Sequence, residues 1–357
     1  VHLGDDVFTA EPVVWRPSTQ GHPHLLVVGL SGMGKTTCLI NICRQLREQG
    51  VLPIVFSYHQ DIDERLGELL GDIRFVDYDG LGYNPLRRPA QEAKHTYLDV
   101  AGEIRDIFVA IFPELGDLQG EALRQAIKES YLEQGWGEPS GAAREADEPA
   151  FGRFVEILRD RPKRDRGMMT LLARLQELED YALFAPCAER GSLWESERPV
   201  VIRVHSTQNQ NLQNAFASLL FYGFYKEMFY RRPQDKVSHF IVFDEAHRAA
   251  RLKLIPKMAQ ECRKYGIGLV LASQQTRDFH VSLFSLIANY LVLRLTDQDA
   301  KALVRNVTTS DQERSLVDKI KQLERYRAFF FCEGRRKPAS ISLAPPSRGP
   351  SGATARV

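Results

Sequence analysis

Residues 29–36 (GLSGMGKT) fit the phosphate-binding pattern G-x-x-x-x-G-K-[ST]. They follow an apolar run at residues 25–29 and lead into a helical pattern at residues 36–49. The glycines allow the backbone to curl so that successive N–H groups face phosphate oxygens, and the helix start adds a positive dipole. We predict that Lys35 reaches the β- and γ-phosphates of a nucleotide and that the Thr36 hydroxyl binds Mg²⁺. The predicted nucleotide-binding residues are Gly29, Ser31, Gly32, Met33, Gly34, Lys35, Thr36 and Thr37.

Two adjacent carboxylates follow a second apolar run, at residues 239–248 (HFIVFDEAHR). At the carboxyl end of a buried strand they emerge where α/β sheets bind ligands. Asp244 is predicted to hold the Mg²⁺ shell, and Glu245 to orient and deprotonate the attacking water. The alternative is a strand that merely ends in solvated acids. The spelling DEAH resembles DEAH-type helicases, but the sequence lacks their QxxGRxGR motif, and His247 is expected to pack or cap beside the site.

A third candidate follows the apolar run of residues 266–278 (GIGLVLASQQTRD). A polar side chain just past a strand beside the acidic one can touch the γ-phosphate or its attacking water. Gln274 is best placed, and Gln275 is next. The alternative is an ordinary polar strand end.

A fourth candidate is Arg294, in the apolar segment NYLVLRLT. A lone arginine in such a run is costly unless its charge has a partner. It is a candidate for a contact with a nucleotide phosphate. If that nucleotide is bound by a neighbouring subunit, Arg294 would act as an arginine finger. Pairing with an acid or snorkelling is an equally good explanation, and Arg277 is a rival.

These residues require a scaffold that brings several strand ends together. Buried-strand patterns recur between helical ones, which is typical of a doubly wound α/β domain with a mostly parallel sheet. The expected strands cover residues 25–29, 52–56, 73–76, 200–204, 240–243, 267–272, 290–295 and 328–332, and the expected helices include 36–49, 212–230 and 254–264. Helical patterns at 115–135 and 168–184 interrupt the alternation.

We therefore expect four segments. Residues 1–86 and 196–343 form the two parts of a RecA-like core, residues 87–195 are an inserted helical subdomain, and residues 344–357 are a disordered tail.

The composition is that of an ordinary globular protein: 357 residues, 43% hydrophobic, 26% charged and a net charge of +1. The net charge carries no signature of nucleic-acid binding, so local clusters such as 159–166, 231–232, 248–253 and 335–337 are the candidates, each more often a solvated face. Five scattered cysteines without a CxxC pair argue for a reducing compartment, and no run approaches the length of a membrane span. We expect a cytoplasmic protein. His22, His24 and His59 have no metal-ligand companions in the sequence, so Mg²⁺ is the only metal expected.

The four motifs, in this order, resemble the HerA–FtsK superfamily of RecA-like ATPases, in particular its HerA-like branch. The segments YHQDID and DGLGYNPL are similar to the ATPase domain of DptH-type proteins, which accompany DNA phosphorothioation-dependent restriction. Two features depart from relatives: Gln274 is followed by Gln275 and Thr276 where many read Gln-Arg-Pro, and no room exists before Gly29 for the β-barrel of HerA. The likeness also makes Asp61 a candidate acid near the site.

The resemblance implies an ATPase that uses ATP and Mg²⁺, assembles as a hexameric homo-oligomer and moves double-stranded DNA without sequence specificity, beside a nuclease or other restriction-system subunits in antiviral defence. The carried-over catalytic residues are Lys35, Glu245, Gln274 and Arg294, and the metal residues are Thr36 and Asp244. Two alternatives stay open. One is a conjugation or secretion ATPase that moves protein or nucleoprotein cargo, and the other is an ATP-gated assembly scaffold.

Overall fold

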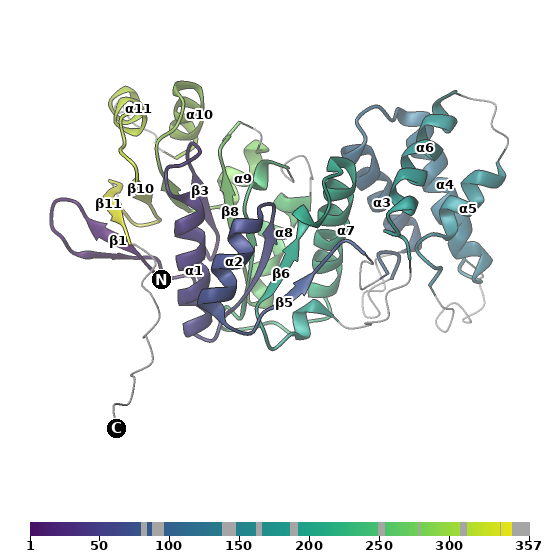
Figure 1. Ribbon diagram of the computed structural model, residues 1–357, viewed down its shortest axis with the longest axis horizontal. Coiled ribbons are helices and arrows are strands. Elements are labelled where there is room, and N and C mark those ends of the chain that lie inside the picture. The colour runs from purple at the N-terminus through teal and green to yellow at the C-terminus, as the bar shows by residue number, and fades with distance from the viewer. Residues whose placement is uncertain are drawn as a thin grey trace. The chain divides into compact units, whose positions relative to one another are not determined.

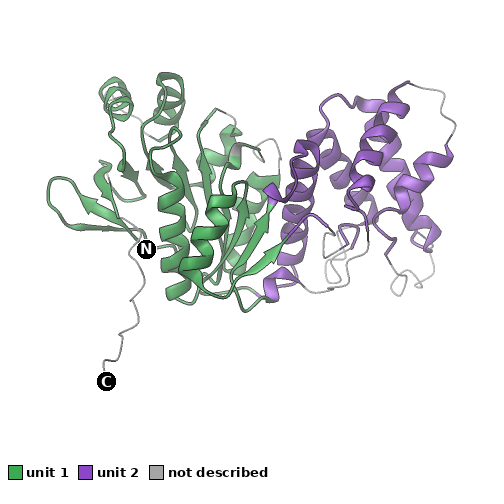
Figure 2. Cartoon of the chain, viewed as in Figure 1, with its two compact units in different colours: residues 1–76, 196–203, 233–357 green, residues 77–195, 204–232 purple. Residues whose placement is uncertain are grey.

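The computed structural model describes residues 1–79, 84–87, 96–137, 148–161, 166–185, 192–248, 254–277, 279–307, 313–335 and 337–344 (Figure 1). These residues form two compact units, coloured separately in Figure 2. The first unit comprises residues 1–76, 196–203 and 233–357, and the second comprises residues 77–195 and 204–232.

The first unit is built on an 11-stranded mixed sheet. Its parallel part has the order β9-β3-β8-β7-β4-β6-β5. The bounds are β3 Leu25–Val28, β4 Leu52–Ser57, β5 Arg74–Val76, β6 Val200–Arg203, β7 His239–Phe243, β8 Ile267–Ser273 and β9 Asn289–Val292. All residues of β3, β7, β8 and β9 are buried, as expected for strands covered on both faces. The predicted α/β class is confirmed.

An antiparallel extension continues the sheet beyond β9, in the order β10-β11-β1-β2. Its strands are β1 His2–Asp6, β2 Pro12–Val14, β10 Arg327–Phe331 and β11 Ala339–Leu343. In β10 and β11 buried and half-exposed residues alternate, so one face of each strand packs on the core and the other is partly solvated. The extension joins both ends of the described chain to one edge of the parallel sheet.

Helices of the first unit follow the strand ends (Figure 1). They are α1 Lys35–Glu48, α2 Gln60–Leu70, α8 Leu254–Glu261, α9 Val281–Leu286, α10 Asp297–Val307 and α11 Glu313–Lys321, with short 3-10 helices at Ala246–Arg248 and Cys262–Tyr265. In α1, Leu39, Ile42, Cys43 and Leu46 are buried at three- and four-residue spacing, which gives the helix one apolar face. That face belongs to the core that also holds side chains of β3 and β9.

The second unit is helical in its described residues. It contains α3 Tyr97–Ile111, α4 Asp117–Glu133, α5 Arg153–Asp160, α6 Arg166–Asp180 and α7 Gln210–Met228, with 3-10 helices at Leu193–Glu195 and Val204–Ser206. A capping box between Thr96 and Asp99 starts α3. Phe154 packs edge-on against Phe108 and Phe184 in the core of this unit. The predicted insertion at 87–195 lies within it, and its role stays a prediction.

Several element boundaries differ from the sequence prediction. The expected strand at residues 290–295 ends at Val292. Beyond it, Leu293 N still donates to Val28 O (2.8 Å) and Arg294 O still accepts from Leu30 N (2.8 Å), so the segment stays beside the loop after β3 until α10 begins at Asp297. The expected helix at residues 254–264 tightens into a 3-10 turn after Glu261 and ends at Gly266, whose φ is 71°. No helix among the described residues is long and apolar enough to span a membrane.

Some sequence expectations fall outside the described residues. They include all of the expected tail beyond Ala344, residues 162–165 of the first basic cluster, Cys187, and the basic residues Arg251 and Lys253. At the start of the first basic cluster, Arg159 contacts Glu179 and Arg161 donates to Glu129 at 2.6 Å. Both arginines are therefore paired inside the helical unit.

Candidate functional site

The loop after β3 is tied to the strands on both sides of it. Gly29 N donates to Ser273 O at the end of β8 (3.1 Å), and Leu30 N donates to Arg294 O just past β9 (2.8 Å). At its other end, Cys38 N donates to Gly34 O within the first turn of α1 (3.0 Å). The loop is thus placed at the carboxyl ends of three parallel strands.

Glycine is required at two positions of this loop for different reasons. A Cβ atom on Gly29 would lie 2.7 Å from the Cβ of Leu293, so a side chain here collides with the segment after β9. Gly34 has a φ of 111°, and a Cβ atom on it would lie 2.7 Å from the ring of Tyr326. The same loop is held there by a hydrogen bond from Tyr326 N to Met33 O at 3.1 Å. Close packing and left-handed backbone together explain the glycines.

Lys35 is the buried cation of the site. Its side chain is 6% exposed, and its ammonium donates to the carbonyl oxygens of Gly29 (2.8 Å) and Leu30 (3.1 Å). Burial lowers the pKa of Lys35, and the nearby carboxylates of Glu245 and Asp244 oppose that shift. The lysine and the two predicted acids therefore share one electrostatic environment.

Asp244 and Glu245 follow β7, which lies between β8 and β4. Glu245 has a φ of 60°, a left-handed backbone conformation at the strand end. One carboxylate oxygen of Asp244 and one of Glu245 lie within 4.8 Å of each other. Asp244 is 2% exposed and its Oδ1 has no hydrogen-bond partner in the described structure. Burial, together with repulsion from Glu245, raises the pKa of Asp244 to about 6, against the opposing charges of His59 and Lys35.

Gln274 lies immediately past β8 and meets Glu245. Its Nε2 donates a hydrogen bond to Glu245 Oε1 at 2.8 Å. The neighbouring Gln275 is exposed, and its backbone N bonds the Ser273 hydroxyl at 3.1 Å. The structure therefore brings Gln274 rather than Gln275 to the predicted acid.

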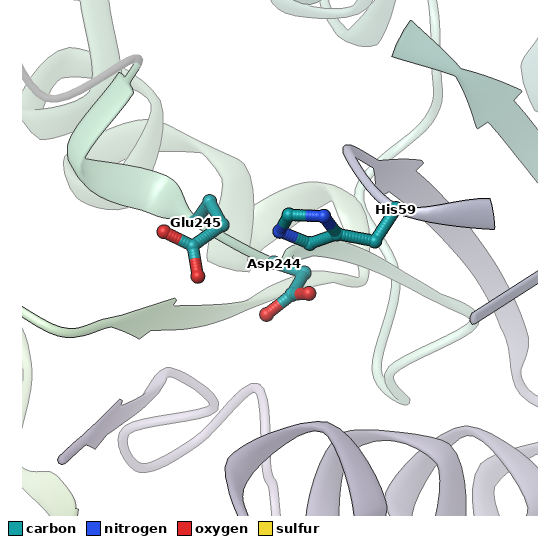
Figure 3. Close-up of side chains that lie close together, drawn as sticks. All are labelled: His59, Asp244 and Glu245. Atoms are coloured by element: carbon teal, nitrogen blue, oxygen red, sulfur yellow. The ribbon is translucent and has the colours of Figure 1, made fainter. Parts of the chain in front are cut away.

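The prediction that His59 has no metal-ligand companions is wrong. His59 follows β4, the strand beside β7, and its imidazole lies beside the carboxylates of Asp244 and Glu245 (Figure 3). One ligand atom from each of the three side chains lies within 4.8 Å of the other two. The adjacency of β4 and β7 was the missing signal. Asp61, the candidate acid of this segment, lies exposed in the first turn of α2.

The two candidate arginines lie in different surroundings. Arg294 is half-buried, its backbone oxygen binds the phosphate-binding loop of the same chain, and its Nε has no hydrogen-bond partner in the described structure. Arg277 donates to Asp299 Oδ1 (3.2 Å) and to Gln298 Oε1 (2.7 Å). Its guanidinium is therefore engaged at the start of α10, and Arg294 stays the candidate for phosphate.

The donor set suits a nucleotide with Mg²⁺. Thr36 lies half-buried in the first turn of α1, directly after Lys35, and Thr37 accepts a hydrogen bond from Arg65 at 3.2 Å. The unpartnered, buried oxygen of Asp244 is a hard oxygen ligand of the type that Mg²⁺ prefers. A backbone-lined loop at a helix N-terminus supplies the matching phosphate site.

No protein-family profile and no curated protein match the sequence. Solved structures do resemble the chain. VirB4 of Thermoanaerobacter pseudethanolicus superposes with a TM-score of 0.75 at 19% identity, over 97% of this chain and 96% of VirB4. The bacterial conjugative coupling protein TrwB, without ligand, gives 0.62 at 14% identity over 97% and 90% of the two chains. TrwB bound to a non-hydrolysable ATP analogue gives 0.65 at 14% over 96% and 90%. At these identities the likeness establishes a shared RecA-like α/β fold.

Proposed function

We propose that this chain is an ATPase whose hydrolysis drives movement along double-stranded DNA. The observation that carries the ATPase part is the hydrogen bond from Gln274 to Glu245, at 2.8 Å, beside the loop that holds Lys35. It joins the ends of β7 and β8 beside the phosphate-binding loop that follows β3, which is an arrangement that phosphoryl transfer can use. The nucleotide complexes of TrwB, including one with ADP and Mg²⁺, support the same use of this fold.

Each residue has a distinct role in the proposed reaction. Lys35 neutralises charge on the β- and γ-phosphates, while Thr36 and Asp244 would hold Mg²⁺, which would offset the charge of the phosphates. Glu245 orients a water for in-line attack on the γ-phosphorus and accepts its proton as the bond to the β–γ bridging oxygen breaks. Gln274 fixes the Glu245 carboxylate. Arg294 stabilises charge on the transferred group.

The DNA part of the proposal rests on two supports. The motif order resembles HerA–FtsK motors, and TrwB, which shares the fold, is described as a plasmid coupling protein. Contacts to the phosphate backbone supply binding without sequence specificity and weaken steeply with salt. We propose a hexameric ring as the working particle, with a nuclease or other restriction-system subunits as partners. In this proposal the ring moves the duplex and the partner acts on it.

A second candidate is favoured by one observation. TrwB is a bacterial conjugative coupling protein, so a role in transfer of nucleoprotein cargo fits the same fold. Deletion of the gene distinguishes the two proposed functions in the cell. Loss of restriction of incoming DNA supports the defence role, whereas loss of plasmid transfer with restriction intact supports the conjugative one.

The test measures ATP hydrolysis with and without duplex DNA, at low and high salt. We expect DNA to stimulate the rate at low salt and the stimulation to fade as salt rises. The variant Glu245→Gln should retain ATP yet lose turnover, while Glu68→Gln, an exposed residue of α2, should behave as the wild type. An ATP hydrolysis rate that duplex DNA does not change at any salt concentration contradicts the proposal that the chain moves along DNA. Full turnover by Glu245→Gln contradicts the catalytic assignment.

Mass measurement of the particle tests the ring. With a non-hydrolysable ATP analogue and duplex DNA, we expect a six-chain assembly. A particle that stays a monomer under these conditions contradicts the ring and any contact of Arg294 with a neighbouring subunit.

A further inference from the structure

His59, Asp244 and Glu245 are the group of three metal-ligating side chains that the described residues bring together, with one ligand atom of each within 4.8 Å of the others (Figure 3). We propose that they form a site for a divalent transition-metal ion of the Zn²⁺ or Mn²⁺ class. This ion binds the protein directly and needs no nucleotide. It therefore differs from Mg²⁺ delivered with ATP.

The buried carboxylate of Asp244 is an independent sign of a cation. Its side chain is 2% exposed, and Oδ1 has no hydrogen-bond partner in the described structure. A buried carboxylate oxygen without a partner is costly, and a bound cation removes that cost. This carboxylate belongs to the same three-residue group as the imidazole, so a cation bound by Asp244 would lie beside His59.

The ligand types select the class of metal. One imidazole nitrogen with two carboxylates suits Zn²⁺ and Mn²⁺, whereas Mg²⁺ prefers an all-oxygen, largely hydrated shell. The Irving–Williams order further favours Zn²⁺ over Mn²⁺ at such a site. Loss of the imidazole should therefore weaken transition-metal binding much more than Mg²⁺ binding.

Backbone contacts hold His59 at the end of β4. Its carbonyl oxygen accepts from the Ser57 hydroxyl (3.0 Å) and from Ile62 N (3.2 Å). Its side chain makes no cap to α2 and is exposed, so an ion from solvent can reach the ring. On the other side, Gln274 orients the Glu245 carboxylate. Ligands that are positioned by outer hydrogen bonds bind metals more tightly.

The consequence for turnover rests on the proposed function. An ion held by Glu245 occupies the carboxylate that accepts the proton of the attacking water. Zn²⁺ therefore inhibits ATP hydrolysis, and it does so through His59.

Direct binding is the first test. Titration of the full chain with Zn²⁺, and with Mn²⁺ followed by electron paramagnetic resonance, is done without nucleotide. We expect one ion per chain, with coupling to an imidazole nitrogen in the Mn²⁺ spectrum. The variant His59→Ala should lose that coupling and should bind both Zn²⁺ and Mn²⁺ at least about tenfold more weakly. The matched control is His22→Ala, because His22 also lies beside a carboxylate, 3.5 Å from Glu333, on the surface.

The proposed site is wrong if His59→Ala binds Zn²⁺ as tightly as the wild type. It is also wrong if His22→Ala loses as much Zn²⁺ affinity as His59→Ala does. If His59→Ala does not fold, His59→Gln preserves the bulk of the side chain without the imidazole and is judged by the same spectrum. Zn²⁺ inhibition of hydrolysis is measured on the same proteins, and the inhibitory concentration should rise in His59→Ala. Metal binding through His59 in a chain without ATPase activity contradicts only the proposed function. Hydrolysis with no His59-dependent metal binding contradicts only this inference.

Discussion

Gln274 Nε2 lies 2.8 Å from Glu245 Oε1 and donates a hydrogen bond to it. The two residues are separated along the chain by α8 and β8, and they meet because β7 and β8 are neighbours whose carboxyl ends share one edge of the sheet. A carboxylate that accepts this bond is fixed in orientation before substrate binds. This contact makes the position of Glu245, the proposed base, dependent on a residue that follows another strand.

Removal of that contact should slow the chemical step. We expect Gln274→Ala to lower kcat by about 10- to 100-fold, because a misplaced base loses its alignment with the attacking water. Nucleotide affinity should change little. The matched control is Gln275→Ala, which removes the same side chain one position later, where it is exposed. Steady-state kinetics with a separate nucleotide-binding titration checks this, and a raised Kd with unchanged kcat contradicts it.

Lys35 should be needed for nucleotide binding itself. We expect Lys35→Ala to weaken ATP affinity by roughly 10- to 100-fold, since a hydrogen bond to a charged group contributes about 1.5–3 kcal/mol. Fluorescent-nucleotide titration measures the effect, and Lys257→Ala, at an exposed position of α8, is the control. The Lys35 ammonium also donates to two loop carbonyls, so its removal can destabilise the loop itself. The thermal unfolding midpoints of both variants are therefore compared, to separate a loss of stability from a loss of ATP binding. Equal affinity in the two variants would show that the loop binds something else.

The two left-handed glycines of the loop should differ in their tolerance of a methyl group. Gly34→Ala is expected to destabilise the fold by about 1–3 kcal/mol or displace Tyr326, since its Cβ meets that ring at 2.7 Å and its φ is 111°. Gly32 has a φ of 75° with nothing within 4 Å of a Cβ, so Gly32→Ala should cost only about 1–2 kcal/mol. Urea unfolding of both variants measures the difference. A larger loss for Gly32→Ala contradicts the packing around Gly34.

His24 should make stability fall in acid. Burial lowers the pKa of His24 from 6.5 to about 4, although its bond to Ala259 O opposes the shift. The unfolded chain therefore binds a proton between these values that the folded chain does not, so stability is full above about pH 6.5 and declines as pH falls toward 4. The expected loss between pH 7 and pH 5 is about 2 kcal/mol from this one residue.

Urea unfolding at the two pH values checks that contribution. The difference between pH 7 and pH 5 should shrink in His24→Gln and persist in His22→Gln, a half-exposed neighbour. The structural cause is that both ring nitrogens are used: Nε2 contacts Ala259 O (2.9 Å) and Nδ1 accepts from Leu269 N (3.1 Å). A pH dependence that is unchanged by His24→Gln contradicts this assignment.

The parts of the fold that local pattern governs could be predicted from the sequence. The buried strands of the parallel sheet read as continuous apolar runs, and the loop glycines have a fixed spacing. Strands β1 and β11 were not predicted, because an alternating segment such as ASISL is too polar to stand out, and one of its two partner strands, β1, lies at the other end of the chain. The predicted strand around Arg294 was too long because its apolar residues continue past the last ladder pair.

The same distinction applies to the candidate site. Lys35, Asp244 and Glu245 could be named as candidates from motifs, and Gln274 from its position after a strand; their roles stay predictions. His59 could not, because its meaning depends on which strand lies beside β7. Strand order is a property of the whole sheet, and no spacing within residues 52–63 encodes it.

The contact between Tyr326 and the loop also orders events during synthesis. Gly34 leaves the ribosome long before Tyr326, whose backbone N bonds Met33 O and whose ring closes over the glycine. A nascent polypeptide that has not yet reached β10 therefore contains the loop without the Tyr326 contact that holds it. We expect ATP retention to arise late in translation, when the last strands have docked, so that unfinished chains do not sequester the nucleotide.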